Sequence, residues 1–153
     1  MKKCINCGNR EFSHSTEEVL YSDVALVEAD VYLCKKCGER YEGFSRIEDL
    51  SRRIAHQLAK KEERLSAPEI RFLRTYLGYS SKDLAAFLAV TPETMSRWET
   101  AALQMSLSME RLLRFMALTD KPISDYGLDN AGTKDQTTKK PHFKQRSGSW
   151  SEA

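Results

Sequence analysis

The hydrophobic positions follow a strand-like pattern in the first third of the chain. In most of the rest they recur every three or four residues, as in helices. Residues 19–44 hold short runs rich in β-branched and aromatic side chains, and residues 29–33 alternate polar and apolar positions into the second cysteine motif. The expected strands span 19–21, 24–27, 29–33 and 41–44. This pattern predicts a small antiparallel sheet.

From residue 45 the apolar positions recur at helical spacing. Ile47, Leu50, Ile54 and Leu58 are three or four residues apart, and charged side chains fill the other positions. One amphipathic helix is therefore expected over 45–65, ending near Arg64. We interpret it as a linker helix whose apolar stripe packs on either domain or on a second copy of the chain.

Residues 66–118 contain the start and stop signals of four further short helices. Ser66, Ser80 and Thr91 each precede a helical segment as an N-cap residue, with Pro or an acidic residue in the first turn. Gly78 ends the first of these helices, and the fourth begins at about Ser108. Short helices joined by tight turns predict an all-α helix-turn-helix bundle.

The last segment, 119–153, has few apolar positions and many Thr, Lys, Ser and Gly residues, so we expect a largely disordered tail. The chain has 153 residues, of which 41% are hydrophobic and 30% charged, which is typical of globular domains. The expected fold is α+β: a small β domain over 1–44, a linker helix over 45–65 and an all-α helix-turn-helix domain over 66–118.

Composition and charge exclude some classes of protein. No apolar run approaches the ~20 residues needed to span a bilayer, and the N-terminus lacks the apolar core of a signal peptide. A cytoplasmic protein without membrane contact is therefore expected. The net charge is only +2, which is weak support for nucleic-acid binding. A DNA-binding function must therefore rest on motifs rather than on overall charge.

All four cysteines fall in two C-x-x-C-G motifs that are separated by 26 residues. Two cysteines that flank a tight turn can bind one metal ion, and the Gly lets the backbone turn back toward the thiolates. The predicted metal ligands are Cys4, Cys7, Cys34 and Cys37. Zinc suits four soft ligands in tetrahedral geometry best, so the β domain over 1–44 is expected to be a zinc ribbon. The spacing also suits iron.

Four protein ligands leave no open coordination position, so we expect one structural Zn²⁺ that holds the fold and catalyses nothing. Persistent disulfides are disfavoured in a reducing cytoplasm. A redox dithiol of the thioredoxin type needs one C-x-x-C motif rather than two. His14 is the only histidine of this domain, and the four cysteines complete the ligand set without it.

The third helix of the predicted bundle carries the strongest candidates for DNA contact. Met95 and Trp98 are three residues apart and are expected to face the core, which leaves Glu93, Arg97 and Thr100 on the outer face. An Arg there can bind guanine through two hydrogen bonds, and a Glu can accept from the amino group of cytosine. Residues at helix starts suit phosphate groups. The candidate DNA-contacting residues are Ser81, Lys82, Thr91, Glu93, Thr94, Ser96, Arg97 and Thr100.

Three segments make the helical part recognisable: GYSSKDLA at 78–85, LAVT at 88–91 and MSRWE at 95–99. They resemble the Cro/C1-type (XRE) helix-turn-helix family, and the likeness extends over about 66–118. Together with the two C-x-x-C-G motifs, the arrangement resembles the MqsA-type antitoxins and their relatives, which carry a YgiT-type zinc finger. This second likeness covers roughly residues 1–118.

The resemblance implies a zinc domain that docks on a ribonuclease toxin and a helix-turn-helix domain that forms a homodimer. It also implies that the dimer represses its own operon at a palindromic operator on double-stranded DNA. In the family the recognition helix follows the pattern N-x-x-S-R. Ser96 and Arg97 match this pattern, Glu93 stands in place of the Asn, and Ala101 stands in place of a Gly that commonly follows the helix.

Two other functions are alternatives. One is a stand-alone zinc-containing XRE-family regulator without a toxin partner. The other is a rubredoxin-like electron carrier with an additional helical domain, which would contain iron. An enzyme is not expected, because no Ser/His/Asp, Cys/His or paired-carboxylate arrangement has supporting context in the sequence.

Overall fold

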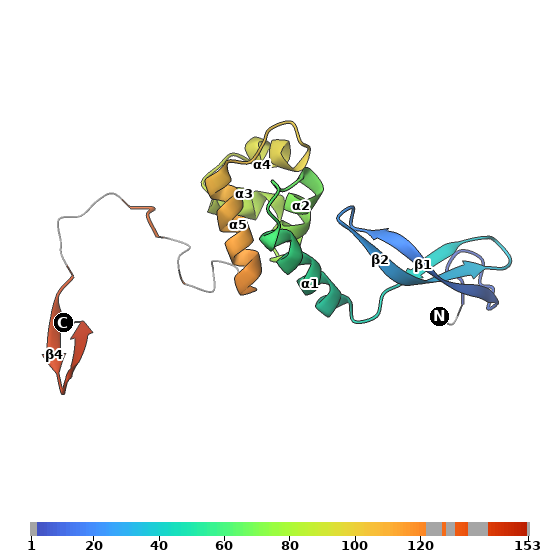
Figure 1. Ribbon diagram of the computed structural model, residues 1–153, viewed down its shortest axis with the longest axis horizontal. Helices are drawn as coiled ribbons and strands as arrows, with labels where there is room; N and C mark the ends of the chain where they lie inside the picture. Colours follow the sequence, from blue (N-terminus) through green and yellow to red (C-terminus); the bar gives the residue numbers. More distant parts are fainter. Residues whose placement is uncertain (1–2, 122–126, 128–130, 135–140, 153) are drawn as a thin grey trace.

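The computed structural model describes residues 3–121, 127, 131–134 and 141–152. Within these residues, a three-stranded antiparallel sheet near the N-terminus is followed by five helices and a second, two-stranded hairpin. Figure 1 shows the sheet and the C-terminal hairpin at opposite ends, with the helices between them. The expected α+β class is confirmed. No described helix is long and apolar enough to cross a membrane.

The three-stranded sheet lies in what we call the sheet region, residues 3–44. Its strands are β1 (Phe12–Tyr21), β2 (Ala25–Cys34) and β3 (Arg40–Gly43). β2 is the central strand, and both of its neighbours run antiparallel to it. Because β2 ends at Cys34, the sheet places one of the predicted metal ligands directly.

The strands are longer than the sequence pattern predicts. The segments 24–27 and 29–33, expected as separate runs, fall in the single strand β2 except for Val24 in the turn, and β1 begins at Phe12 instead of residue 19. The first half of β1 is polar, so its side chains gave no apolar signal. It is a strand because β2 pairs with its backbone groups while most of its side chains stay in solvent.

The helices form what we call the helical region, residues 47–119. They are α1 (Ile47–Lys60), α2 (Ala67–Tyr76), α3 (Ser81–Phe87), α4 (Pro92–Glu99) and α5 (Leu107–Thr119). Side-chain oxygens of Ser80 and Thr91 accept hydrogen bonds from backbone N–H groups in the first turns of α3 and α4, as expected for N-caps. α1 ends at Lys60, earlier than the expected end near Arg64, and the cap of α5 is Ser106.

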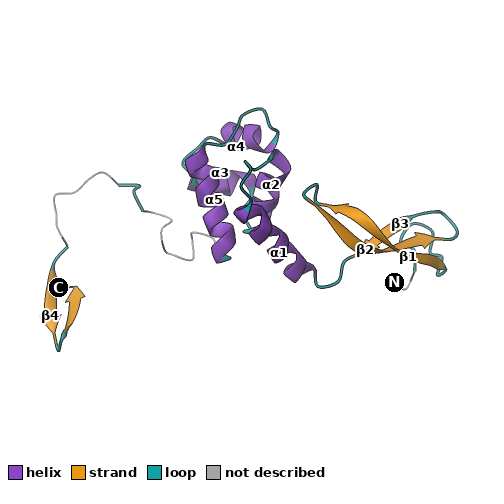
Figure 2. Ribbon diagram, viewed as in Figure 1, coloured by secondary structure: helices purple, strands orange, loops and turns teal. Residues whose placement is uncertain are grey.

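The helices, drawn in purple in Figure 2, share one apolar core. Its largest fully buried apolar side chains are Leu73, Leu84, Met95, Met105, Leu113 and Met116. Ile54 and Leu58 of α1 also belong to it, so the apolar stripe of α1 packs inside the chain. Of the two alternatives for this stripe, packing within the chain or on a second copy, the structure shows the first for Ile54 and Leu58.

Two buried carboxylates hold helices and loops together. Glu110 of α5 is 1% exposed and forms ion pairs with Arg64 and Arg114, and Glu99 at the end of α4 pairs with Arg74 of α2. Among the described residues, every buried side-chain nitrogen or oxygen has a hydrogen-bond partner. The sequence analysis did not predict these ion pairs.

The turn end of the β1–β2 hairpin packs against the helical core. The partly buried side chains in this contact are Tyr21, Val24, Ala25 and Val27. The Tyr21 ring lies edge-on to Phe72 of α2 with centroids 6.3 Å apart, and its hydroxyl is 3.1 Å from Ser51 Oγ of α1. The sheet region therefore contacts the helical region through one end of its longest hairpin.

The segment 119–153, expected to be a largely disordered tail, lies in good part outside the described residues. Within the described part, β4 (Phe143–Arg146) and β5 (Ser149–Glu152) form an antiparallel hairpin that the sequence analysis did not predict. The side chains of Phe143 and Trp150 are 53% and 72% exposed on this hairpin. The apolar signal of two isolated aromatic residues was too weak to indicate strands.

Candidate metal centre and candidate nucleic-acid interface

Both C-x-x-C-G motifs fold into the same tight loop. The Gly8 N–H donates to the carbonyl oxygen of Cys4, and the Gly38 N–H donates to that of Cys34, each at 2.9 Å. The two glycines have φ values of +72° and +74°, in the left-handed region that favours glycine. The Gly of each motif thus turns the backbone so that both cysteines of the loop point to the same side.

The four cysteine sulfurs meet between the two loops. All of them lie within 4.8 Å of one another, with 3.6 Å between Cys4 Sγ and Cys37 Sγ and 3.5 Å between Cys7 Sγ and Cys34 Sγ. These thiols are free, since a disulfide needs about 2.05 Å. A tetrahedral ion with metal–sulfur bonds of about 2.3 Å separates its ligands by about 3.8 Å. The predicted grouping of the four cysteines is confirmed, and the group can hold a metal ion.

The electrostatics of the cluster favour a bound cation. Burial opposes ionisation of Cys34, but the N–H groups of Cys37 and Lys36, with other hydrogen bonds, outweigh it and lower the pKa of the thiol to about 6. The Glu39 N–H favours the thiolate of Cys37, yet the neighbouring thiols and burial raise its pKa to about 12. Four thiolates cannot share this space unless a positive charge offsets their repulsion.

Two further residues support the sulfurs and were missed by the sequence analysis. Tyr41 of β3 accepts a hydrogen bond from the Ile5 N–H at 2.9 Å, which leaves its own O–H to donate to Cys4 Sγ at 3.2 Å. The Asn9 side-chain amide donates to Cys34 Sγ at 3.6 Å. Such outer contacts orient metal ligands and stabilise thiolates. Their signal in the sequence is weak, because a Tyr in a strand is usually there for packing.

His14 lies in β1 and is occupied elsewhere. Its ring stacks on Tyr32 with centroids 4.8 Å apart, and its Nε2 is 2.8 Å from Asp30 Oδ1. Within the described part of the chain, the group of potential metal ligands around the sulfurs holds the four cysteines alone. This agrees with the expectation that His14 is not needed as a ligand.

The other candidate site is α4, whose two faces differ sharply. Met95 and Trp98 are 0% and 5% exposed and belong to the helical core, as expected. Glu93, Ser96 and Arg97 are exposed on the other side. No ion pair or side-chain hydrogen bond of Glu93 or Arg97 occurs among the described residues, so the two side chains are not paired with each other one turn apart.

The remaining candidates lie around α4 in different environments. Thr91 Oγ1 accepts the Thr94 N–H at 3.1 Å as the N-cap of α4, and Thr94 is half-buried. The Thr100 hydroxyl donates to the Ser96 carbonyl at 2.9 Å. At the start of α3, Lys82 is exposed and Ser81 is half-buried. α3 packs on α4.

The end of α4 holds two features that matter for its position. Glu99 pairs with Arg74, and its carbonyl accepts from Arg71 at 2.8 Å, so both groups tie α4 to α2. Ala101 has φ +61° and turns the chain out of the helix in a conformation that favours glycine. The glycine missing from the sequence pattern is thus replaced by an Ala in left-handed conformation.

Comparison of the chain with protein-family models, with curated proteins and with solved structures found no significant match. Function is therefore inferred from the residues and their geometry.

Proposed function

We propose that the chain is a sequence-specific DNA-binding repressor that uses α3 and α4 as a helix-turn-helix. The observation that supports this best is the division of α4 into two faces. Met95 and Trp98 anchor one face in the core, while Arg97 and Glu93 are exposed and unpaired within the described residues. A helix held in this way, with a free guanidinium on its outer face, suits insertion into the major groove of DNA.

The residues around α4 have different tasks in this proposal. Arg97 binds a guanine edge through two hydrogen bonds, and Glu93 accepts from a cytosine amino group one helical turn away. Lys82 and the backbone at the helix starts bind phosphates. The hydroxyls of Thr91 and Thr100 already bond to their own helix, so they position α4 more than they read bases.

A palindromic operator requires a second copy of the chain, and the outer face of α5 supports one. Leu107, Phe115 and Leu118 are 45%, 58% and 37% exposed and share one stripe of this helix. Large apolar side chains that gather on one face mark interaction sites more often than scattered ones do. Packing of two α5 stripes against each other gives the two-fold symmetry that a palindromic site requires.

The cysteine cluster completes the proposal as a structural zinc site. Four thiolates suit zinc, and since the protein fills every coordination position, the ion stabilises the sheet region and leaves no place for a substrate. Iron in the same site would indicate the electron-carrier alternative, and a red, iron-containing preparation would favour it.

The resemblance to antitoxins extends the proposal to a protein partner, a ribonuclease toxin that docks on the sheet region. A stand-alone regulator is the alternative. The gene next to this one distinguishes them: a short gene for a basic, ribonuclease-like protein favours the antitoxin.

Arg97→Ala tests the DNA-binding proposal. Duplexes selected by the wild-type protein from a random library serve as specific DNA, and scrambled versions serve as non-specific DNA. We expect the variant to lose about tenfold or more in affinity per half-site for the selected duplexes, and almost nothing for the scrambled ones at matched salt. The matched control is Arg53→Ala, which removes another exposed Arg, on α1, and should change neither affinity.

Equal losses of Arg97→Ala on both DNAs would assign Arg97 to phosphate binding instead. Failure of the wild-type protein to enrich any sequence would contradict the proposed function. Circular dichroism of each variant shows whether the helices are intact.

A further inference from the structure

We infer that one face of the three-stranded sheet is a docking surface for a positively charged protein. In the β1–β2 pairing, Glu18 lies directly opposite Glu28 and Leu20 lies directly opposite Leu26. Directly opposed residues share a face of the sheet, as do residues two positions apart. All four side chains therefore lie on the same face. We call these four residues the acidic–apolar face.

The apolar half of this face is uncovered. Leu20 and Leu26 are 58% and 70% exposed, although they adjoin the turn end of the hairpin that packs on the helices. Their neighbours on the opposite face of the sheet, such as Val19 and Ala29, are buried. Two adjacent, exposed leucines on a regular sheet form an apolar centre that a partner can cover.

The acidic half of the face is electrostatically unbalanced. Glu18 and Glu28 are exposed like charges in direct opposition, which destabilises an antiparallel pair. Neither has a hydrogen bond or an ion pair among the described residues. By contrast, Glu17 on the opposite face binds Arg40 at 2.8 Å. The sheet thus neutralises the acid on its other face and leaves this pair without a counter-charge, which points to a partner that supplies one.

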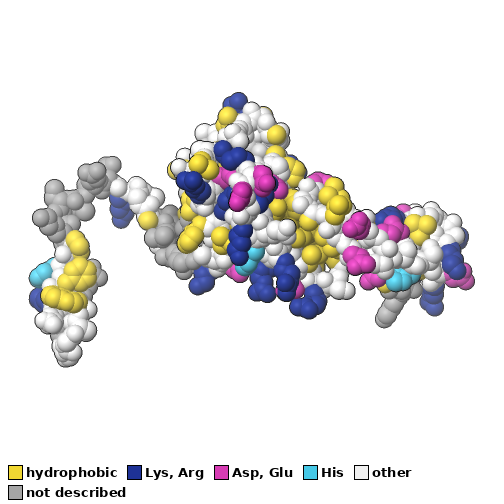
Figure 3. Space-filling view, in the orientation of Figure 1, with side chains coloured by type: hydrophobic (Ala, Val, Ile, Leu, Met, Phe, Trp, Pro, Cys, Tyr) yellow, Lys and Arg dark blue, Asp and Glu magenta, His cyan; other side chains and the backbone are white. Residues whose placement is uncertain are grey.

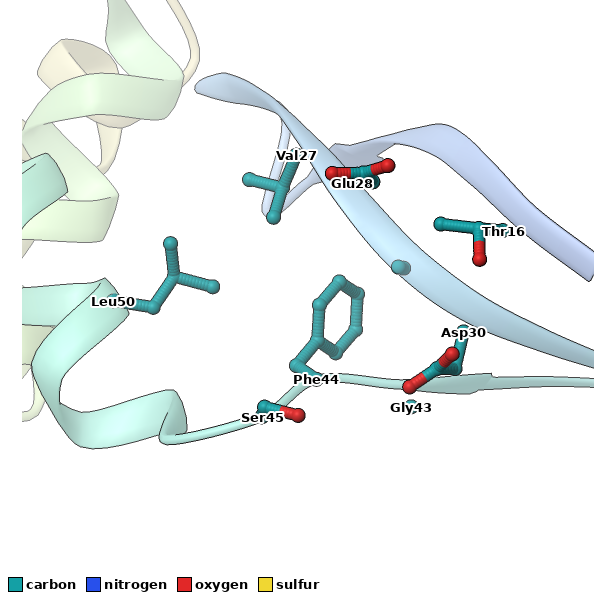
Figure 4. Close-up of a pocket in the computed structure, with 9 residues that line it drawn as sticks. Thr16, Val27, Glu28, Asp30, Gly43, Phe44, Ser45 and Leu50 are labelled. Atoms are coloured by element: carbon teal, nitrogen blue, oxygen red, sulfur yellow. The ribbon is translucent and has the colours of Figure 1, made fainter.

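A hollow beside Glu28 offers a place for a basic side chain. It has a volume of about 410 Å³ and lies between β2, the end of β3 and the start of α1 (Figure 4). Glu28 and Asp30 line it from β2, and Phe44 and Leu50 provide apolar walls. Because Phe44 packs against the apolar cluster of the opposite face, the hollow lies at the edge of β2, beside the acidic–apolar face. The only basic group on this face of the strands is His14, which is already bonded to Asp30. A Lys or Arg of a partner would meet two carboxylates there and could lay its methylene groups along Phe44.

The charge of the face selects the class of partner. Carboxylates repel the phosphates of nucleic acids and the headgroups of anionic membranes. An apolar centre flanked by charge is the usual composition of a protein–protein interface, and complementary charge increases its association rate. Figure 3 shows acidic side chains gathered over the part of the sheet nearest to the helices, where this face lies. The partner is therefore a protein that presents Lys or Arg around an apolar patch.

The surface is also held ready for binding. The cysteine cluster fixes one end of the β1–β2 hairpin, and the contact of Tyr21 with the helices fixes the other. A preorganised surface loses little conformational entropy on association. This inference deepens the proposed function and rests on its protein-partner part, since a basic ribonuclease has the required charge.

Site-specific photo-crosslinking tests the inference on the full chain in cells that carry its gene. Leu26 is replaced by p-benzoyl-phenylalanine, and the same probe at Leu103, an exposed leucine of the helical region, is the control for position. We expect the probe at Leu26 to form an adduct with a protein whose crosslinked peptide has a net positive charge. We expect no such adduct from the probe at Leu103.

Neutralisation of the acidic pair gives a second, quantitative readout. In the probe-bearing chain, Glu18→Gln with Glu28→Gln should lower the adduct yield at least tenfold, whereas Glu18→Asp with Glu28→Asp should keep most of it. Because the Gln substitutions also remove a repulsion, the hairpin should be at least as resistant to amide exchange as in the wild type. A merely structural role of the two acids would instead lower both the yield and the exchange protection.

The inference is wrong if the adduct is a second copy of this chain, a nucleic acid, or a neutral or acidic protein. It is equally wrong if no adduct forms, or if neutralisation leaves the yield unchanged. Binding of the selected DNA duplexes by the same Gln variant separates the two proposals. Loss of the adduct with retained DNA binding supports the docking surface independently of DNA binding. An unchanged adduct yield contradicts the docking surface and leaves the DNA-binding proposal, which the selection by the wild-type protein tests, unaffected.

Discussion

In the sheet region, the separate apolar cluster of buried residues consists of Val19, Ala29 and Val31, with Phe44 packed against it. The helical region has a core of eighteen buried side chains among the described residues, together with two buried carboxylates that are paired with Arg. A core as small as that of the sheet rarely suffices for a stable fold. The helices therefore fold on apolar burial, while the sheet depends on whatever joins the two cysteine loops.

The two regions also differ in how their charged groups are neutralised. Buried charges in the helical region are paired, and two of the pairs, Arg64 with Glu110 and Arg74 with Glu99, join elements that are far apart in the sequence. In the sheet region the thiols of Cys34 and Cys37, whose pKa values are shifted in opposite directions, belong to a cluster that can hold a metal ion. The buried acids of the helices have their counter-charges within the chain, whereas four thiolates in the sheet region would need the charge of a bound ion.

Loss of the metal should have the largest effect. Structural zinc in small domains contributes on the order of 10–16 kcal/mol at pH 7. We expect Cys34→Ser to release the metal and to unfold most of residues 3–44, while the helices keep their structure. Hydrogen exchange measured separately for β2 and α5 checks this. Protection of β2 in the variant would show that the sheet has a sufficient core of its own.

Removal of Glu110 should have the second largest effect, this time in the helical region. Glu110→Ala leaves Arg64 and Arg114 without their buried partner, and breaking a buried ion pair costs about 3–5 kcal/mol. Urea denaturation followed by circular dichroism measures the loss. Glu62→Ala, at an exposed position without an ion pair among the described residues, should stay within about 0.5 kcal/mol of the wild type. A loss below 1 kcal/mol for Glu110→Ala would mean that the network contributes little.

Lowering the pH should destabilise the two regions at different pH values. The loss of stability in the helical region should be smaller than that caused by either substitution. Burial raises the pKa of Glu110, but hydrogen bonds from Arg64, Arg114 and the Leu65 N–H outweigh it and hold the pKa below its ordinary value. A depressed folded-state pKa contributes stability above the unfolded value, about 4.3, and this contribution is lost as the pH falls through the folded-state pKa.

The cysteine thiolates, in contrast, compete with protons for the metal at a higher pH. We therefore expect metal release to precede the unfolding of the helices during acid titration. A metal-sensitive dye and the helical circular dichroism signal, recorded together, check the order. Coincident transitions would show that the two regions unfold as one unit.

The smallest expected effect is a gain in stability at Ala101. Its φ of +61° costs an L-residue about 1–2 kcal/mol relative to glycine, and a glycine gives back part of this gain through the entropy of the unfolded chain. We expect Ala101→Gly to stabilise the helical region by about 1 kcal/mol or less. Ala86→Gly in α3 is the control and should destabilise it by about 0.5–1 kcal/mol. Effects of the same sign at both positions would contradict this explanation.

The features that the sequence predicted correctly are those set by local chemistry. The N-caps Ser80 and Thr91 and the turn glycines of both cysteine motifs bond to groups only a few residues away. Their effects can therefore be predicted from the local sequence. The inward position of Met95 and Trp98 follows from helical period alone. The grouping of four sulfurs follows from the repetition of one motif.

The features that the sequence did not show depend on partners far along the chain. Glu110 looks like a surface charge until Arg64, 46 residues away, is brought beside it. Tyr41 reaches Cys4 across 37 positions. The polar half of β1 has no apolar alternation, and it is a strand because β2 offers a matching backbone edge. Such pairings are decided by tertiary structure, which overrides local preference.

The register of the β1–β2 hairpin has a consequence for how this chain can change in length. Phe12 pairs with Cys34 at the cysteine end, and Tyr21 pairs with Ala25 at the end that touches the helices. Inserting one residue into either strand would turn every side chain beyond it to the other face. Two residues added to both strands would keep all faces and lengthen the ribbon by about 7 Å. The hairpin therefore acts as a spacer. Its length can change by two residues per strand without altering the cysteine loops at one end or the contact with the helices at the other.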